Sequence, residues 1–197
     1  MITPSPCSVR FPCQSGNKKQ AMSYTRRHKN VLITGTPGTG KSSICEKLLP
    51  VLPNYQYINV GEFADERQLY IEYDDELECY ILDEDAVVEH MRPIMEDENG
   101  GMIVDYHGCD FFPQEWFDAV FVLRTSTTPL FNRLSDRGYS QKKLDSNVES
   151  EIFQLILDEA KSSFTQVYEL KNDGPSDLEE NVDFIRDWIE RNSRQSF

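Results

Sequence analysis

The stretch GTPGTGKS, from Gly35 to Ser42, follows the short apolar run NVLIT, which begins at Asn30. It satisfies the pattern G-x-x-x-x-G-K-S/T, in which glycines allow backbone N–H groups to turn toward a phosphate. The preceding run is typical of a buried parallel strand, and residues 41–49 are spaced like a helix that Pro50 ends. A strand, a glycine loop and a helix in this order predict a loop that binds the phosphates of ATP or GTP.

The polar side chains of this loop have separate expected roles. Lys41 is expected to reach the β- and γ-phosphates, and Ser42 is expected to supply a hydroxyl oxygen to Mg²⁺. The N-terminus of the following helix adds the positive end of its dipole. The residues expected to contact the phosphates of ATP are Gly35, Gly38, Gly40, Lys41, Ser42 and Ser43.

Beyond the loop, candidate strands alternate with candidate helices. The further strand candidates are residues 55–60, 101–106, 118–124 and 166–170. The helix candidates are residues 125–138, residues 148–164 and the amphipathic segment with Leu178, Val182, Ile185 and Ile189. The acidic segment 61–98 is predicted to be rich in helix, with one helix beginning near Asp83. This alternation predicts an α/β fold with a five-stranded parallel sheet and helices on both faces.

Composition limits the classes of function. The 197 residues carry a net charge of −14, although residues 1–45 hold seven Lys or Arg and no acid. An acidic body repels phosphate backbones, so we expect no direct specific DNA binding and favour a basic protein as partner. The five cysteines form no C-x-x-C pair, which argues against a disulfide framework and a zinc site. No apolar run of the length needed to span a membrane is present, so no membrane association is expected.

The first 29 residues are predicted to be a disordered, basic N-terminal tail, because they are rich in proline and serine and poor in large apolar residues. Two other interpretations are open. The lack of acids fits a mitochondrial transit peptide, although three prolines oppose the helix such peptides form. Residues 18–29 also resemble a short basic nuclear address, and Met22 is a second candidate start.

A second motif, MIVDYHGCD, runs from Met102 to Asp110. Asp105 ends an apolar strand, and two interpretations are open. It is the acid that organises Mg²⁺ at the carboxyl end of such a strand, or it simply caps the strand. His107 has three interpretations: a structural residue that holds the loop after the strand, a group that orients or partly deprotonates a water attacking the γ-phosphate, or a metal ligand together with Cys109.

At this point several segments between residues 30 and 192 carry a family resemblance. YINVGEFADERQLY, IVDYHGCDFFP and DRGYSQKKL, together with the phosphate loop, resemble the adenylate kinase isoenzyme 6 family, also called the coilin-interacting nuclear ATPases. The resemblance implies a P-loop kinase domain over residues 30–197. Within it, the nucleotide-acceptor segment lies at about residues 59–82 and a short lid at about residues 136–146.

The resemblance also implies activity, partners and location. It implies that the γ-phosphoryl group of ATP is transferred to AMP with Mg²⁺ as cofactor, and that ATP is also hydrolysed. It further implies a role in maturation of the small ribosomal subunit through a ribosomal protein, in the nucleus and also in the cytoplasm. Within the acceptor segment, it assigns AMP binding to Asn59, Gly61 and Arg67.

Two arginines, Arg133 and Arg137, lie four residues apart and therefore on one face of a predicted helix. The resemblance implies that Arg133 stacks on adenine and that Arg137 reaches the ATP phosphates, tasks that suit a planar and permanently charged guanidinium. The alternative is a solvated helix face with salt bridges to Asp136 or Glu159.

Two positions depart from the family pattern. Asp65 and Glu115 stand where the family usually has basic residues, and Arg67 is two residues from the first position. A step of two residues turns a helical side chain by about 200°. We therefore carry two hypotheses: an adenylate kinase that is also an ATPase, and an ATP-hydrolysing assembly factor for a ribosomal protein with vestigial AMP kinase activity. A kinase for another small acceptor is the third.

Overall fold

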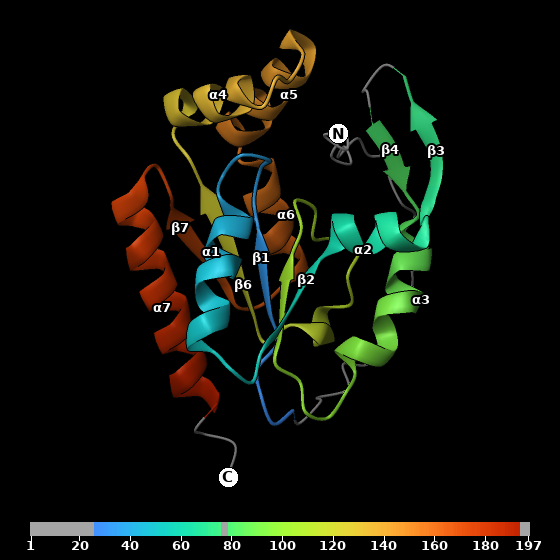
Figure 1. Ribbon diagram of the computed structural model, residues 1–197, viewed down its shortest axis with the longest axis vertical. Helices are drawn as coiled ribbons and strands as arrows, with labels where there is room; N and C mark the ends of the chain where they lie inside the picture. Colours follow the sequence, from blue (N-terminus) through green and yellow to red (C-terminus); the bar gives the residue numbers. More distant parts are fainter. Residues whose placement is uncertain (1–25, 76–78, 194–197) are drawn as a thin grey trace.

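The computed structural model describes residues 26–75 and 79–193. Its main sheet has the order β2-β5-β1-β6-β7, with every neighbouring pair parallel, and helices cover both faces (Figure 1). The predicted α/β fold with five parallel strands is confirmed. The strands are β1 Val31–Thr34, β2 Gln56–Asn59, β5 Met102–Asp105, β6 Ala119–Arg124 and β7 Val167–Lys171.

The two faces of the sheet bury separate apolar cores, because successive side chains of a strand point to opposite sides. In β1, Val31 and Ile33 pack in the core beneath α1 and α7. Leu32 packs in the core on the other face, beneath α2 Val60–Arg67, α3 Glu84–Met95 and α6 Leu155–Ser163. These three residues are completely buried, which explains why a central strand reads as an unbroken apolar run. The helices on the first face are α1 Lys41–Leu48 and α7 Pro175–Ser193.

The segment predicted to be rich in helix contains a hairpin that the prediction missed. Helix α2, Val60–Arg67, ends at Gln68, which adopts the left-handed conformation with φ of 55°. The antiparallel strands β3, Tyr70–Asp74, and β4, Cys79–Leu82, follow before α3, Glu84–Met95. Tyr80 packs against Tyr70 and Tyr73 across the hairpin, with ring centroids 5.1 and 5.0 Å apart. These cross-strand aromatic contacts, rather than the acids between them, decide the local structure.

The segment predicted as one helix over residues 148–164 is two helices. Helix α5, Gln141–Ile152, and helix α6, Leu155–Ser163, are separated at Gln154, which has φ of 58°. The break lets α6 turn Ile156 and Leu157 into the core below the sheet. The helical spacing of apolar residues does not by itself reveal such a break, because the same spacing resumes after it.

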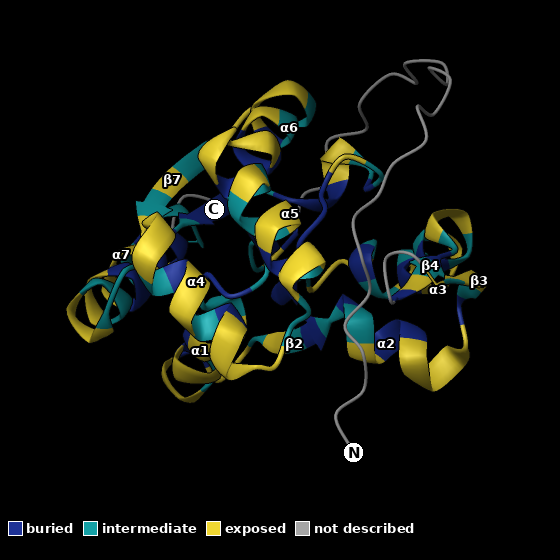
Figure 2. Ribbon diagram, turned by 90° about the horizontal axis from the view of Figure 1, so that it is seen from above, coloured by how far each residue is buried: buried dark blue, intermediate teal, exposed yellow. Residues whose placement is uncertain are grey.

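Helices α4, Thr127–Asp136, and α5 form a unit above the carboxyl ends of the strands, and their outer surfaces are exposed (Figure 2). They pack together through Leu130, Leu134 and Leu144, a small apolar cluster separate from the two main cores. The predicted lid, residues 136–146, falls on the corner between these helices, and its role as a lid stays a prediction.

The fold begins before residue 30, which corrects the predicted boundary of the tail. Arg26 is buried and donates to the Glu115 carbonyl oxygen at 2.6 Å, and His28 forms a parallel bridge with Gly100. The hydrogen bond to Glu115 and the pairing of Arg26 with Asp118 at 3.5 Å help to offset the entropy cost of ordering residues 26–29. Residues 1–25 lie outside the described residues, so the tail over that range stays a prediction.

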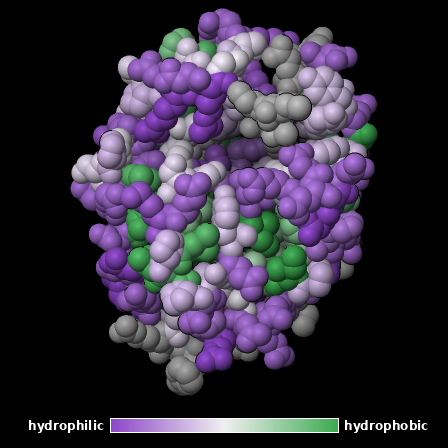
Figure 3. Space-filling view, in the orientation of Figure 1, coloured by the Kyte–Doolittle hydropathy of each residue, from purple (hydrophilic) through white to green (hydrophobic). Residues whose placement is uncertain are grey.

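The surface is mainly hydrophilic on the face seen in Figure 3, where apolar residues form separate patches. This fits the net charge of −14. None of the helices in the described residues is both long and apolar enough to cross a membrane.

Candidate nucleotide and phosphoryl-transfer site

The phosphate loop, residues 35–40, has the backbone conformation that its glycines predict. Gly40 caps the N-terminus of α1 with φ of 97°, and a Cβ placed there would lie 2.4 Å from the Nδ2 atom of Asn172. That same Nδ2 donates to the Thr39 carbonyl oxygen at 2.6 Å. Glycine at this position therefore permits both the left-handed backbone and the close approach of the Asn172 side chain.

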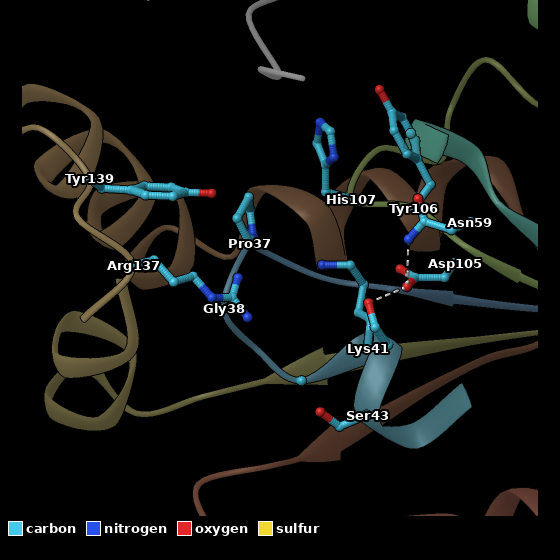
Figure 4. Close-up of a pocket in the computed structure, with 13 residues that line it drawn as sticks. Pro37, Gly38, Lys41, Ser43, Asn59, Asp105, Tyr106, His107, Arg137 and Tyr139 are labelled. Atoms are coloured by element: carbon cyan, nitrogen blue, oxygen red, sulfur yellow. Dashed lines mark hydrogen bonds between the residues drawn. The ribbon is translucent and has the colours of Figure 1, made fainter. Parts of the chain in front are cut away.

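Lys41, the first residue of α1, projects into the cavity beside this loop (Figure 4). Its Nζ donates to the carbonyl oxygens of Gly35 at 2.8 Å and Thr36 at 3.2 Å. Burial lowers the pKa of the ammonium, and the carboxylate of Asp105 opposes that lowering. The lysine is thus held against the phosphate loop, where the predicted role requires its charge.

Asp105, at the carboxyl end of β5, is buried and accepts three hydrogen bonds on Oδ2. The donors are Ser42 Oγ at 2.7 Å, Tyr57 Oη at 3.0 Å and Asn59 Nδ2 at 3.2 Å. Parallel register places Asp105 beside Ile33, two residues before the loop begins. The sheet therefore brings together the hydroxyl and the carboxylate that the sequence assigns to Mg²⁺.

This pair has the chemistry that Mg²⁺ prefers, namely hard oxygen donors from few residues, with waters and phosphates completing the octahedron. Among residues 26–75 and 79–193, no group of three or more His, Cys, Asp and Glu side chains is arranged to hold a metal ion. A site with one carboxylate and one hydroxyl fits a magnesium ion that arrives with its nucleotide.

His107 lines the same cavity as Lys41 and Asp105, and the residue is 7% exposed. Its ring packs against Tyr106, with centroids 4.1 Å apart. Cys109, the suggested metal partner, is fully buried within the apolar core. The position of His107 therefore favours the two interpretations that do not need Cys109, as a structural residue or as a group facing the phosphates.

Arg137 and Tyr139 approach the cavity from the corner between α4 and α5 (Figure 4). Arg137 also lines an adjoining cavity with Arg133, Asp173 and Leu178. Arg133 donates to the carbonyl oxygens of Gly38 at 3.2 Å, Asn172 at 3.1 Å and Asp173 at 2.7 Å. It thus ties α4 to the phosphate loop and to the loop before α7. The alternative interpretation, a solvated helix face, does not include these contacts.

The acceptor residues separate into two groups. Asn59 and Gly61 line the main cavity, and Asn59 Oδ1 accepts the backbone N–H of Glu62 as the cap of α2. Arg67 is not brought there: its guanidinium lies 3.8 Å from the centroid of the Phe63 ring and donates to the Phe63 carbonyl oxygen. The helical rotation over two residues accounts for this outcome. Arg67 instead lines a neighbouring cavity together with Asn59, and its assignment to AMP stays a prediction.

Several residues that complete the site were missed from the sequence. Tyr57 precedes Asn59 by two residues on β2, so strand periodicity places both side chains on one face, and this signal was available. Tyr139 lies two residues after Arg137 within the predicted lid, so a signal was available there too. Glu151 and Asn172 lack such a signal, because each reaches the site from an element distant in sequence.

The fold is that of a P-loop nucleotide kinase. Its parallel sheet has the order β2-β5-β1-β6-β7, a glycine loop follows the central strand β1, and an acid ends the neighbouring strand β5. Residues 31–154 match the model of a family described as AAA domain. The fold is similar to that of shikimate kinase from Bacteroides thetaiotaomicron, with a TM-score of 0.58 and 16% identity over 82% of this chain and 98% of that chain.

Relatives at higher identity identify the family. Proteins named adenylate kinase isoenzyme 6 homolog are 44% identical in Drosophila melanogaster, over 81% of this chain and 90% of that protein, and 42% identical in Caenorhabditis elegans, over 82% and 89%. A protein of the same name in Dictyostelium discoideum is 43% identical over 86% of this chain and 96% of that protein. The chain belongs to the adenylate kinase isoenzyme 6 family.

Proposed function

We propose that the protein transfers the γ-phosphoryl group of ATP to AMP and also hydrolyses ATP. The observation that carries the proposal is a single cavity lined by Lys41, Asp105, Arg137 and the start of α2. One end of this cavity has the phosphate loop, and the other has the N-terminal residues Asn59 and Gly61 of the acceptor segment. A donor and an acceptor phosphate bound at these ends would face each other.

The phosphate loop would bind ATP through its backbone N–H groups and the start of α1, with Lys41 on the β- and γ-phosphates. Ser42 and Asp105 would hold Mg²⁺, which when bound neutralises charge on the phosphates. Arg137 would add positive charge from the lid corner, and the cavity beside Arg133 would take the base. Closing of this corner over the nucleotide would exclude water from the transfer.

AMP would bind at the N-terminus of α2, because the positive end of the helix dipole favours an anion. Asn59 fixes this terminus by capping it and by donating to Asp105. Since Arg67 contacts Phe63 instead, the acceptor phosphate would rely on few cations. We therefore expect weak binding of AMP.

Water would be the second acceptor. His107 lies in the cavity between the loop and Tyr106, where its imidazole would orient a water toward the γ-phosphate. In this role His107 would accept a proton from the water, and Arg137 would stabilise charge on the transferred group.

The second candidate is an ATP-hydrolysing assembly factor for a small-subunit ribosomal protein, with vestigial AMP kinase activity. The observation that favours it is the acceptor segment, where Asp65 accepts from Tyr70 and Arg67 lies away from the cavity. The net charge of −14 would attract a basic ribosomal protein. Residence in the nucleus and the cytoplasm, as the resemblance implies, belongs to this proposal and is checked by imaging the tagged chain.

Product analysis tests the two candidates. Purified protein with Mg-ATP should form ADP faster when AMP is added, with two ADP per ATP consumed in the transfer. A rate of ADP formation independent of AMP would contradict adenylate kinase activity and leave ATP hydrolysis as the reaction.

The assembly-factor proposal expects that a basic ribosomal protein changes the rate of ATP hydrolysis. An affinity for this partner that is the same with ATP, ADP or no nucleotide would contradict the proposal. A panel of other small acceptors exposes the third hypothesis.

A further inference from the structure

A buried carboxylate at the end of α5 connects the lid unit to the phosphate loop. Glu151 is 5% exposed, although the next two residues of the chain are exposed. Its Oε2 accepts the hydroxyl of Thr36 at 2.5 Å, and its Oε1 accepts Arg124 Nε at 2.6 Å and the Thr125 N–H at 3.0 Å. Loss of a partner would leave a buried charge or donor unsatisfied, so this arrangement holds its members in place.

Thr36 carries the effect of this carboxylate into the phosphate loop. Thr36 is 1% exposed, and its hydroxyl points to Glu151 while its carbonyl oxygen points into the loop. That carbonyl accepts the Thr39 N–H at 3.2 Å, the Thr39 hydroxyl at 2.8 Å and Lys41 Nζ at 3.2 Å. A single residue therefore links α5 to the turn of the loop and to its lysine.

The same network reaches the loop by a second route. Thr125, whose N–H donates to Glu151, also donates its hydroxyl to the Asn172 carbonyl oxygen at 3.2 Å. Asn172 in turn donates its side chain to the Thr39 carbonyl oxygen. Glu151 is thus connected to both Thr36 and Thr39, which are the two threonines of the loop.

We propose that Glu151 is a positioning residue for nucleotide binding, which acts through Thr36 to fix the phosphate loop in the conformation that receives a nucleoside triphosphate. The proposal rests on the proposed binding of ATP at this loop. A carboxylate that merely stabilised the fold would change the melting temperature and leave the affinity for nucleotide unaltered.

Two variants test this from both ends of the contact. Thr36→Val removes the hydroxyl at nearly constant volume, and Glu151→Gln removes the charge at constant shape, whereas Thr36→Ser retains the hydroxyl. The matched control is Asp118→Asn, because Asp118 is a carboxylate that accepts the Asn30 N–H at 2.9 Å and Lys29 Nζ at 3.1 Å near the opposite end of the sheet. The measurements are the Kd of Mg-ATP by calorimetry, kcat and KM, and the melting temperature without nucleotide.

We expect Thr36→Val and Glu151→Gln to raise the Kd and the KM for Mg-ATP about three- to tenfold, the effect of losing about one hydrogen bond, with kcat changed by less than about twofold. Thr36→Ser should keep the wild-type Kd, and Asp118→Asn should lower only the melting temperature. If Glu151→Gln does not fold, Thr36→Val decides.

Wild-type affinity in Thr36→Val, with a lower melting temperature like that of Asp118→Asn, would overturn the inference and make Glu151 structural. A wild-type chain that binds no Mg-ATP would instead contradict the proposed function, and the inference would fail with it. The two failures are therefore distinguishable by the wild-type titration alone.

Discussion

The two halves of the cavity differ in the charged groups that they offer to a phosphate. The half around residues 35–43 has Lys41 in the cavity, with Arg133 and Arg137 reaching it from α4 and the corner after it. The half around α2 has acids at Glu62, Asp65 and Glu66 and a single arginine that contacts Phe63. The half around residues 35–43, which we call the donor half, concentrates positive charge. The half around α2, which we call the acceptor half, offers a phosphate mainly the N-terminus of a helix.

This difference would separate the two proposed activities physically. In the proposed complex, ATP would meet fixed backbone donors and buried or partly buried cations, which interact strongly because little water screens them. AMP would meet a helix terminus, whose field is weaker and falls off within one turn. Transfer to AMP and hydrolysis, as proposed, would share the donor half and differ in the acceptor half, and variants in each half should separate them.

The largest expected effect comes from Lys41→Met, which removes the buried charge of the donor half. We expect both AMP phosphorylation and ATP hydrolysis to fall by about 10³-fold or more, since both reactions need this charge on the phosphates. Turnover of ATP by the variant, measured as ADP released, should be at background. Retained turnover in a variant whose melting temperature matches wild type would refute the role of the phosphate loop.

The donor half could be predicted from the sequence because its geometry is local. Gly35, Gly38 and Gly40 have positive φ, and eight consecutive residues from strand to helix carry both the turn and the ligands. Asp105 was also predictable, because parallel strands end at one edge of the sheet. The three inner strands β5, β1 and β6 followed from their apolar runs, because burial on both faces of the sheet requires them.

The acceptor half and the connecting network could not be predicted in the same way. The β3–β4 hairpin depends on Tyr80 meeting Tyr70 and Tyr73, which is a matter of cross-strand register rather than of composition. Glu151 reads as one acid among many on a helix, and its burial depends on Thr36, 115 residues away in the chain. Contacts of this kind depend on tertiary packing, which a pattern of residues does not specify.

A smaller effect, confined to one activity, is expected for His107→Gly. Hydrolysis should fall by about 10²-fold, the usual contribution of a group that positions or deprotonates a nucleophile, whereas AMP phosphorylation should fall much less. Parallel assays of ADP formed with and without AMP give the ratio. Equal losses in the two assays would identify His107 as a structural residue of the loop after β5.

Asn59→Ala perturbs the residue that touches both halves. Its Oδ1 caps α2 and its Nδ2 donates to Asp105, so we expect the KM for AMP to rise about fivefold, equivalent to the loss of one cap. The matched control is Asp83→Ala, which removes the cap of α3 where Asp83 accepts the Ala86 N–H at 3.0 Å outside the cavity. An equal rise of the KM for AMP in both variants would show a general loss of stability instead.

The smallest effect is expected for Arg67→Ala, and it is the sharpest test of the acceptor half. Because the guanidinium stacks on Phe63 and pairs with Glu66 at 3.0 Å, its removal should change the KM for AMP by less than about twofold. Arg92→Ala is the control, since Arg92 pairs with Glu89 and Glu96 on the surface of α3. A tenfold rise of the KM for AMP in Arg67→Ala alone would mean that Arg67 leaves Phe63 when AMP binds. The helix terminus would then not suffice for the acceptor phosphate, and the two halves would be more alike in charge than their present geometry makes them.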